Sequence, residues 1–351
     1  MKRTGNLYGT MISDENIIKA IKEVNKTHRW KKHHKPNKVV AWVESDIPAR
    51  VIELREIIEN GFEPSECHQF TIYDKTSEKY RDIFMPKLWP DQYIHHILVQ
   101  VLQKSIMRKM DNWVCGSIPG RGIHYGVKGI KKWMRNGKKT KYCAELDIRH
   151  FYQNIQTEIV IESLLKIIKD RRVIDLCERI LRNGVSIGLY TSQWFANLIL
   201  QELDEIIRKN SSRYIRYMDN LTIFSANKRK LIYEVSEWLH SHKLKLKSNW
   251  QLFRTKNRMP QALGYRYGNG YLIPRKRNLF RLKRQLARVY KRIDKYGKPS
   301  VDQACGLMSR IGQLKWCNST SIRMKYIKPG LLAKLKSVIR NRQRKDLVCY
   351  G

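Results

Sequence analysis

The stretch RYIRYMDNLTIFS, from Arg213 to Ser225, predicts a tight β-hairpin whose turn carries an acid and an amide. The flanking segments RYIRY and LTIFS are rich in the aromatic and β-branched residues that are typical of strands. Met218, Asp219 and Asn220 lie between them. Asp and Asn are common in turns because their side chains bond to nearby backbone and tolerate unusual dihedral angles. Taken alone, the stretch fits either a plain turn or a pair of side chains held for chemistry.

The composition indicates a folded protein that binds a polyanion. The 351 residues are 42% hydrophobic, which is enough for a core, and they could form two or three domains or one large enzyme body. Lys and Arg number 70 against 31 Asp and Glu, a formal charge of +39. Such an excess is expected where a polyanion neutralises it, with nucleic acid as the leading candidate. A membrane surface is the alternative, but no apolar run approaches the length that spans a bilayer.

The cysteines and the N-terminus favour a cytoplasmic protein. Seven cysteines, at positions 67, 115, 143, 177, 305, 317 and 349, include no C-x-x-C pair. This pattern fits reduced thiols and argues against a zinc module or a disulfide scaffold. The first residues, MKRTGNLYGT, lack the apolar core of a signal peptide.

The positive charge is concentrated in the C-terminal segment. Residues 275–351 contain 22 Lys or Arg, three Asp and no Glu. Within residues 278–297, apolar residues recur at steps of three and four, which predicts an amphipathic helix. These apolar residues are Leu279, Leu282, Leu286, Val289 and Ile293. Gly297 and Pro299 end this helix, and a second helix is expected from Ser300 to about Trp316. The charge favours binding to a phosphate backbone over a merely solvated basic face.

A second basic run, HRWKKHHKPNK, lies near the N-terminus at residues 28–38. Five of its eleven residues are Lys or Arg and three are His. The run fits a mobile arm that touches nucleic acid or an ordinary surface loop equally well. No second cluster of metal ligands lies near the histidines in the sequence, so we predict no metal site there.

The middle of the chain predicts an α+β body with two converging acids. TKYCAELDI (140–148) fits a buried strand that ends at Asp147, and helices are expected at 158–170 and 191–209. There is no G-x-G-x-x-G or Walker loop. Asp147 and Asp219 would lie on one sheet, where their carboxylates could hold Mg²⁺. Two such ions can activate an attacking oxygen and stabilise a leaving one, which suggests phosphoryl or nucleotidyl transfer.

Seven segments, in order, resemble the conserved blocks of reverse transcriptases. CAELDIRHFYQNI (143–155), GVSIGLYTSQWFANLILQELD (184–204) and RYMDNLTIFS (216–225) resemble the A, B and C motifs of the palm. The other four are KTSEKYRDIFMPKLWPDQYIHH (75–96), SIPGRGIHYGVKGIKKWM (117–134), HKLKLKSNWQLF (242–253) and LGYRYGNGYLIPR (263–275). They resemble a fingers motif, the next conserved block with its Pro-Gly-Arg turn, and the D and E motifs.

The resemblance implies a right-hand polymerase fold and an RNA-directed DNA polymerase. Residues 1–70 would form a basic N-terminal extension, 71–275 the fingers and the palm with its antiparallel sheet, and 276–351 a basic helical thumb and tail. Ser192-Gln193 is similar to the bacterial and phage enzymes of diversity-generating retroelements, whereas the Gln-Gly signature of group II intron enzymes is not evident. The alternatives are a phage-defence reverse transcriptase that copies its own noncoding RNA, and a non-catalytic RNA-binding scaffold.

The resemblance also assigns roles near the two acids. Asp147 and Asp219 would bridge two Mg²⁺ ions, for which Mn²⁺ could substitute, and the Ile148 carbonyl would add a ligand. Arg81, with Lys75 or alternatively Lys79, would grip the phosphates of the incoming dNTP.

Three further residues have a role in the family pattern and a plainer alternative. Tyr152 would stack under the sugar, or simply pack in the core. Gln193 would touch the nucleotide or the template base, or cap its helix. Lys247 would protonate the pyrophosphate, with Lys245 as a competitor and an ordinary surface lysine as the plain alternative.

The expected partners are a structured template RNA, a cDNA or primer strand and dNTPs, with a small accessory protein or an oligomer as further partners and no membrane. The expected location is the cytoplasm of a bacterium, with a bacterial or phage gene. Eight basic residues are expected to bind nucleic acid: Arg121, Arg275, Lys276, Arg277, Arg281, Lys283, Arg284 and Arg288.

Asn220 departs from the family pattern, which ends in Tyr-x-Asp-Asp. An amide offers one carbonyl oxygen and no charge, so it should bind Mg²⁺ more weakly than a carboxylate. Asn220 fits a natural variant, an engineered inactivation or an inactive copy kept for RNA binding. The intact motifs around it favour the natural variant.

Overall fold

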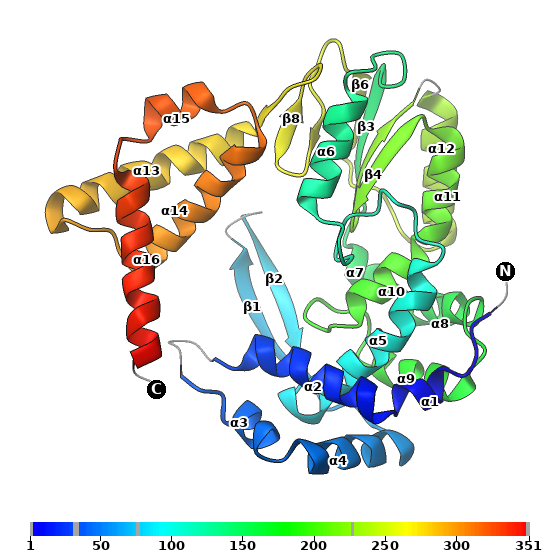
Figure 1. Cartoon of the computed structure of the whole chain (residues 1–351). Coiled ribbons are helices and arrows are strands. Elements are labelled where there is room, and N and C mark those ends of the chain that lie inside the picture. Colours follow the sequence, from blue (N-terminus) through cyan, green and yellow to red (C-terminus); the bar gives the residue numbers. More distant parts are fainter. Residues whose placement is uncertain (1–2, 31–34, 75–77, 226–227, 349–351) are drawn as a thin grey trace.

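The chain folds into a mixed arrangement of helices and antiparallel strands (Figure 1). The computed structural model describes every residue except 1–2, 31–34, 75–77, 226–227 and 349–351. Lys75 and part of the basic N-terminal run therefore lie outside the described residues. The N-terminal helices lie at the bottom of the view, a four-stranded sheet with its helices lies at the upper right, and the C-terminal helices form a separate group.

The central sheet has the strand order β4-β5-β3-β6, and all neighbouring strands are antiparallel. Its strands are β3 (Tyr142–Asp147), β4 (Arg213–Tyr217), β5 (Asn220–Phe224) and β6 (Gln251–Arg254). The strand that ends at Asp147 and the hairpin are both confirmed. The turn between β4 and β5 is shorter than the sequence suggests, because Asn220 already pairs with Tyr217. Asn220 is therefore the first residue of a strand, and only Met218 and Asp219 form the turn.

The helix predicted for residues 158–170 is shorter in the structure. It is α8 (Thr157–Leu165). The chain leaves the helix because the following backbone bonds to the N-terminal segment instead. The Thr4 N–H donates to the Ile167 carbonyl, and the Lys169 N–H donates to the Thr4 carbonyl, both at 2.8 Å. A contact between distant parts of the chain thus overrides the local helical pattern.

The long helix predicted for residues 191–209 is two helices. α10 (Ser192–Ile199) and α11 (Gln201–Asn210) are separated at Leu200, whose ψ of −2° departs from helical geometry. The interruption lets the two helices pack in different places. α10 packs on α5 (Tyr93–Met107) and α8, whereas α11 packs on β4 and α12 (Lys228–Ser241).

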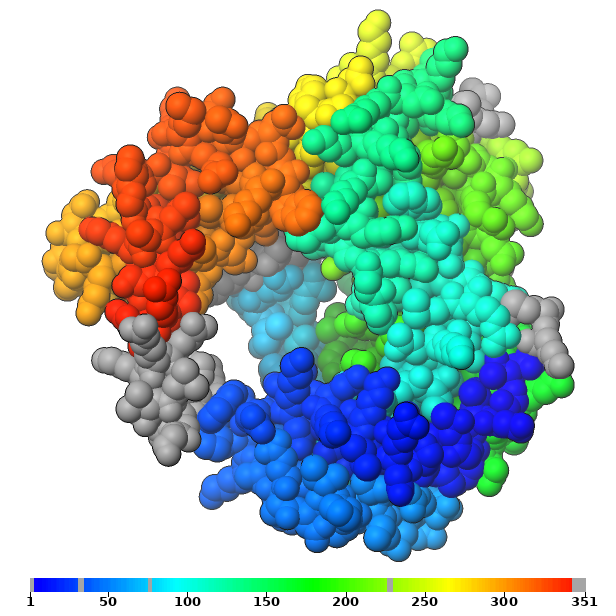
Figure 2. Space-filling view, viewed as in Figure 1, coloured from blue at the N-terminus to red at the C-terminus, as the bar shows by residue number. Residues whose placement is uncertain are grey.

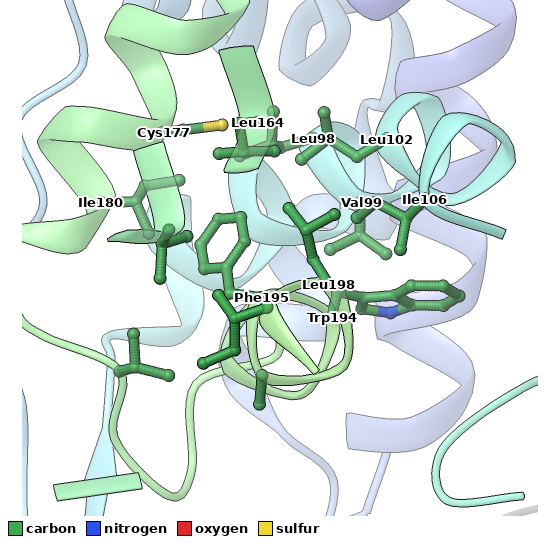
Figure 3. Close-up of a cluster of buried hydrophobic side chains, with 14 of the residues drawn as sticks. Leu98, Val99, Leu102, Ile106, Leu164, Cys177, Ile180, Trp194, Phe195 and Leu198 are labelled. Atoms are coloured by element: carbon green, nitrogen blue, oxygen red, sulfur yellow. The ribbon is translucent and has the colours of Figure 1, made fainter. Parts of the chain in front are cut away.

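A hydrophobic cluster joins α10 to the helices around it (Figure 3). The cluster draws side chains from α5, α8, α9 (Arg171–Leu181) and α10. Its labelled members are Leu98, Val99, Leu102, Ile106, Leu164, Cys177, Ile180, Trp194, Phe195 and Leu198. Close packing of this kind fixes α10, which precedes the hairpin in the chain, relative to the rest of the body.

The N-terminal helices belong to the same hydrophobic core. They are α1 (Leu7–Met11), α2 (Asp14–His28), α3 (Lys38–Ser45) and α4 (Ile47–Glu59). Ile17, Ile21 and Val24 of α2 are buried in the cluster that contains the α5 side chains. The first part of the chain therefore supports the central helices.

Several further elements surround the central sheet or project from the body. The hairpin of β1 (His68–Asp74) and β2 (Lys79–Met85) reaches toward the C-terminal helices, and a π-helix, η2 (Leu88–Gln92), follows it. α6 (Ile123–Trp133) and the short α7 (Phe151–Asn154) flank the central strands. A small antiparallel sheet completes the body, with strands β7 (Gln261–Ala262), β8 (Tyr265–Tyr267) and β9 (Leu272–Pro274).

The C-terminal helices have a hydrophobic core of their own. They are α13 (Lys276–Tyr296), α14 (Val301–Gln313), the 3-10 helix η3 (Leu314–Trp316), α15 (Thr320–Tyr326) and α16 (Leu331–Val348). The predicted amphipathic helix is confirmed as α13, which buries Leu282, Leu286 and Val289. It ends at Gly297, whose φ of 69° suits glycine, and α14 begins after its N-cap Ser300.

In the part of the chain that is described, six cysteines are free and none forms a disulfide, as the sequence predicts. Cys349 lies outside that part. No described helix has both the length and the apolar character needed to cross a membrane.

Candidate active site

The two predicted acids meet where the central strands end. Asp147 is the last residue of β3 and pairs directly with Asn220, the first residue of β5. Directly opposed residues in an antiparallel pair have Cα atoms about 4.5–5.5 Å apart and side chains on one face. The Ile148 N–H donates to the Asp219 carbonyl at 3.2 Å, which ties the two acidic segments together. Residues 72 positions apart in the chain (219 − 147) are thus neighbours at one edge of the sheet.

The electrostatic setting favours a bound cation. Burial raises the pKa of Asp219, and the nearby carboxylate of Asp147 raises that pKa further. Lys247 and a hydrogen bond from Asn220 oppose these effects only in part. Asn220 Nδ2 donates to Asp219 Oδ1 at 2.9 Å. A divalent cation between the carboxylates would relieve their repulsion.

The donor set suits magnesium rather than zinc. Within the described ranges, no group of three or more His, Cys, Asp or Glu could hold a metal ion. Asp147 and Asp219 supply hard carboxylate oxygens, as Mg²⁺ prefers, and Mg²⁺ commonly completes its shell with water and substrate phosphate. The residues present therefore fit a metal that is shared with a phosphate ligand. The Ile148 carbonyl, expected as a further ligand, belongs to the residue that follows Asp147.

Lys247 lies in this site, whereas the side chain of Lys245 does not. Lys247 Nζ forms an ion pair with the Asp147 carboxylate, and the Lys247 N–H donates to the Asp147 carbonyl at 2.8 Å. Lys245 contributes a backbone carbonyl, which accepts from the Arg149 N–H at 2.8 Å, while its side chain is exposed. Of the two candidate proton donors, Lys247 has the geometry to reach the acids.

Tyr152 is a half-buried residue of the short helix α7. Burial raises the pKa of its hydroxyl, and the charge of Asp219 raises it further, whereas Arg81 opposes the shift. The ring also packs against the main hydrophobic core and lies 5.5 Å from that of Phe151. Tyr152 therefore has the packing contacts of the plainer alternative, and its role at the sugar stays a prediction.

The candidates for binding triphosphate lie on the β1–β2 hairpin. Arg81 is on β2, and its Nε donates to Asp74 Oδ2 at 3.0 Å. Lys79, also exposed, pairs with Asp74 across the hairpin. The charge of Arg81 is one of those that lower the pKa of the Tyr152 hydroxyl. Lys75, the first choice from the sequence, lies outside the described residues.

Gln193 lies beside a cavity that also reaches the end of β4. It is exposed in the first turn of α10 and lines a cavity of about 370 Å³ together with Arg121, Tyr190 and Tyr217. Thr191, not Gln193, is the N-cap of α10. Arg121 is partly held by the protein itself, because its Nη1 donates to the Asp111 carbonyl at 2.7 Å. Tyr217 also lines the larger cavity beside the acids.

That larger cavity, of about 1070 Å³, extends from Asp147 and Asn220 to residues of α13, α14 and η3. Asp147 and Asn220 line one side, and Trp250, Arg275, Arg277 and Trp316 are among the other lining residues. His124 stacks on Trp316 with ring centroids 3.9 Å apart, which links α6 to η3. Figure 2 shows the molecule hollowed between the C-terminal helices and the N-terminal half.

The predicted nucleic-acid-binding residues of the C-terminal segment differ in exposure and in their contacts. Arg277 lines the cavity and is exposed, and Lys276, Arg284 and Arg288 are also exposed. Arg275 reaches the cavity too, but it is half-buried and its Nη2 donates to the Gln261 carbonyl at 2.7 Å. Its bond to the small sheet indicates a structural contribution that the sequence did not predict.

Two other basic residues of α13 have protein partners. Lys283 lies over the ring of Tyr326, 4.5 Å from its centroid. Arg281 forms an ion pair of 2.6 Å with Glu78, at the tip of the β1–β2 hairpin. Since the hairpin and α13 are far apart in the sequence, this ion pair connects two separate parts of the molecule.

Arg216, which the sequence pattern did not single out, holds the turn that carries Asp219 through the Met218 carbonyl. Its guanidinium binds both carboxylate oxygens of Asp204, at 2.8 and 2.7 Å. The available signal is an arginine within an apolar strand pattern that is followed at once by the turn. Pattern alone does not show which buried acid would pair with it.

The comparisons with known proteins identify the family. The family model "Reverse transcriptase (RNA-dependent DNA polymerase)" matches residues 73–267, more than half of the chain. Similar solved structures include apo telomerase from Candida tropicalis truncated from its C-terminal domain, with 11% identity, a TM-score of 0.47, and coverage of 64% of this chain and 59% of that one.

Telomerase from Candida albicans, in complex with a TWJ fragment of telomeric RNA, is similar at 8% identity and a TM-score of 0.47. That match covers 62% of this chain and 46% of the other. The chain thus spans about half of these two telomerase chains, 59% and 46%. The search of curated proteins found no match. The match to the family model, over the residues that carry the two acids and their hairpin, shows that this chain belongs to the reverse transcriptase family.

Proposed function

We propose that the protein is an RNA-directed DNA polymerase whose nucleotidyl-transfer centre is formed by Asp147 and Asp219. The single observation that carries the proposal is the register that places Asp147 opposite Asn220, with Asp219 next to it in the turn. Family membership supports RNA-directed DNA synthesis in general. The pairing supplies two carboxylates at one point, which is what a two-metal transfer requires.

In this proposal each residue acts from its observed position. Asp147 and Asp219, with the Ile148 carbonyl, would hold two Mg²⁺ or Mn²⁺ ions. Those ions would activate the attacking 3′ oxygen and stabilise charge on the phosphates. Arg81 would exchange its ion pair with Asp74 for the triphosphate. Lys247 would leave Asp147 and give a proton to the departing pyrophosphate.

Two side chains would select and orient the nucleotide. Tyr152, whose hydroxyl pKa is raised by the charge of Asp219, would lie under the sugar and exclude a 2′-hydroxyl. Gln193 lines the smaller cavity beside Tyr217, where it would meet the incoming nucleotide or the template base. In right-hand terms, the β1–β2 hairpin would serve as part of the fingers, the central sheet as the palm and α13–α16 as the thumb.

Asn220 fits this function as a natural variant. Its amide N–H donates to Asp219 Oδ1, which orients that carboxylate. An ionised aspartate at this position could only accept hydrogen bonds and would repel Asp219. Asn220 therefore contributes an orienting contact in place of a negative charge.

The proposed substrates are a structured template RNA, a DNA primer or growing strand, and dNTPs, in a retroelement that diversifies a target gene. Ser192-Gln193 at the start of α10 supports this subfamily. An accessory protein or a second copy could take part, and the proposed location is the bacterial cytoplasm. Sequencing the nucleic acid that copurifies with the protein tests the retroelement role. A single noncoding RNA that serves as the protein's own template would favour the phage-defence alternative.

Primer extension on an RNA template tests the activity. The purified protein should incorporate dNTPs with Mg²⁺ or Mn²⁺, and Asp147→Ala and Asp219→Ala should each abolish incorporation while RNA binding persists. Incorporation that survives both substitutions would place the chemistry elsewhere. RNA binding without incorporation under any metal condition would support the non-catalytic scaffold.

A further inference from the structure

A charged network is buried beneath the turn that carries Asp219. The side chain of Arg216 is 0% exposed and that of Asp204 is 2% exposed. Nε and Nη2 of Arg216 bind the two carboxylate oxygens of Asp204 in the bidentate geometry that suits this pair. Arg216 Nη1 donates to Asn197 Oδ1 at 2.8 Å and to the Met218 carbonyl at 3.2 Å. The guanidinium therefore contacts the helices α10 and α11 and the turn at once.

The turn needs such a support. Met218 has φ of 55°, in the left-handed region that is costly for a residue with a side chain. Its carbonyl is the group that Arg216 holds. On the other side, Gly116 lies so close that an added Cβ would be 2.6 Å from the Met218 nitrogen. The turn is thus confined between Arg216 and the backbone at Gly116.

The same network links the turn to α10 and to the loop that precedes α6. Asn197, which accepts from Arg216, donates through Nδ2 to the Gly116 carbonyl at 3.1 Å. The backbone of Arg216 pairs with that loop as well: its N–H donates to the Trp113 carbonyl at 3.1 Å, and its carbonyl accepts from the Cys115 N–H at 2.8 Å. The loop, α10 and the turn therefore meet at Arg216, the loop through the Arg216 backbone and the other two through its side chain.

A buried ion pair adds little net stability, because desolvation of the two charges offsets much of their attraction. Removing two charges from water costs several kcal/mol per ion, and apolar residues of similar volume often serve as well or better. The Arg216–Asp204 pair is therefore better explained by what it fixes. Its contact with the Met218 carbonyl lies one residue before Asp219.

We infer that Arg216 is a positioning residue, which, held by Asp204 and Asn197, sets the Met218–Asp219 turn so that Asp219 meets Asp147 across a divalent cation. The inference rests on the proposed function for the role of the acids. It concerns no direct contact of Arg216 with substrate or metal. The Ile148 N–H bond to the Asp219 carbonyl reports the position that Arg216 would set.

The test separates fold stability from turn position. The double variant Arg216→Met with Asp204→Leu replaces both charges by apolar side chains and should remain folded. Arg216→Lys retains a charge opposite Asp204 but loses the fork that also reaches Met218 and Asn197. Each variant is assayed for thermal unfolding, for Mn²⁺ affinity by electron paramagnetic resonance, and for exchange of the Ile148 amide.

Arg179→Met is the matched control, because Arg179 binds Glu63 and the Gly61 carbonyl far along the chain from the acids. In the double variant and in Arg216→Lys, the dissociation constant for Mn²⁺ should rise about 10- to 100-fold, the range seen when supporting partners of metal ligands are removed. The Ile148 amide should exchange faster, and the control should change neither measurement.

Three outcomes would overturn the inference. The first is a folded double variant that binds Mn²⁺ and protects the Ile148 amide as the wild type does. The second is unfolding of both variants, which would make the pair a requirement for folding alone. The third is Mn²⁺ binding by the wild type that Asp219→Ala does not weaken, since no site would then exist for Arg216 to position. A wild type without polymerase activity, but with Arg216-dependent Mn²⁺ binding, would refute the proposed function and leave the inference standing.

Discussion

Asp147 and Asn220 pair directly across β3 and β5, so the residue that departs from the Tyr-x-Asp-Asp pattern faces one acid across the sheet and donates a hydrogen bond to the other. The two acids and this amide therefore form one unit. The stability of this unit should differ between the metal-free and the metal-bound protein. A bound cation would offset the repulsion between the two carboxylates, which the uncharged Asn220 does not increase.

The substitution Asn220→Asp tests this balance. The added carboxylate should repel Asp147 and Asp219 in the metal-free protein, lowering the melting temperature, and should lower the Mg²⁺ concentration needed for half-maximal activity. Melting with and without Mg²⁺, together with a Mg²⁺ titration of primer extension, measures both effects. Activity that appears only in the Asp variant would instead identify the present protein as catalytically impaired.

Lys247→Met should slow nucleotide incorporation about 10²-fold or more, the usual contribution of a positioned proton donor. The reason is the observed contact of Lys247 with Asp147, which places its ammonium in the site. Single-turnover incorporation measures the effect, and RNA affinity should not change. Lys245→Met is the matched control, because that side chain is exposed and only its backbone contacts Arg149. An equal loss in both variants would contradict a specific role.

The exposed arginines of α13 should contribute to nucleic-acid affinity through phosphate contacts. Arg277→Ala and Arg284→Ala should each weaken binding and reduce the slope of log K against log salt by about one. Binding to a fixed RNA–DNA duplex at several salt concentrations measures the slope. Lys166→Ala, which removes a surface pair with Glu202, provides a control that should leave it unchanged.

Arg275→Ala should behave differently from these arginines. Because Arg275 is half-buried and donates to the Gln261 carbonyl, its loss should mainly lower the melting temperature. A change in salt slope without a change in melting would contradict this assignment.

The paired histidines of α5 should make stability depend on pH. Burial first, and then the neighbouring histidine charges, lower the pKa of His95 and of His96 from 6.5 to about 4. Both are therefore neutral in the folded protein, while the unfolded chain takes up protons below about 6.5. The stability that these neutral histidines contribute to the folded protein is fully present above about pH 6.5 and is lost as the pH falls toward 4.

His96→Phe should flatten this dependence. Phenylalanine can keep the stacking on Tyr190, now 3.7 Å between ring centroids, without a titrating nitrogen. The loss in free energy of unfolding between pH 7 and pH 5 should be smaller in this variant, since each tenfold difference in proton affinity between the folded and unfolded chains is worth about 1.4 kcal/mol. Glu23 Oε2 lies 3.8 Å from His96 Nδ1, so the effect of this carboxylate on the pH dependence is measured separately with Glu23→Gln. An unchanged pH profile in His96→Phe would show that other groups dominate.

The sequence predicted the elements that local pattern determines. A strand ending in an acid and a hairpin around Asp219 follow from alternation and turn residues, and the family resemblance joined them into one site. The helix break at Leu200 and the early end of α8 could not be predicted, because both depend on packing and on the distant residue Thr4. Arg216 shows the same limit, since only the fold reveals that Asp204 is its buried partner.

The ion pair between Glu78 and Arg281 has a topological consequence. Through it, the tip of the β1–β2 hairpin touches α13, so the space before the acids is bounded on that side as well. In the proposed polymerase, a polynucleotide would enter this space by a free end while the contact persists. A covalently closed circular RNA would then be copied only after this ion pair opens.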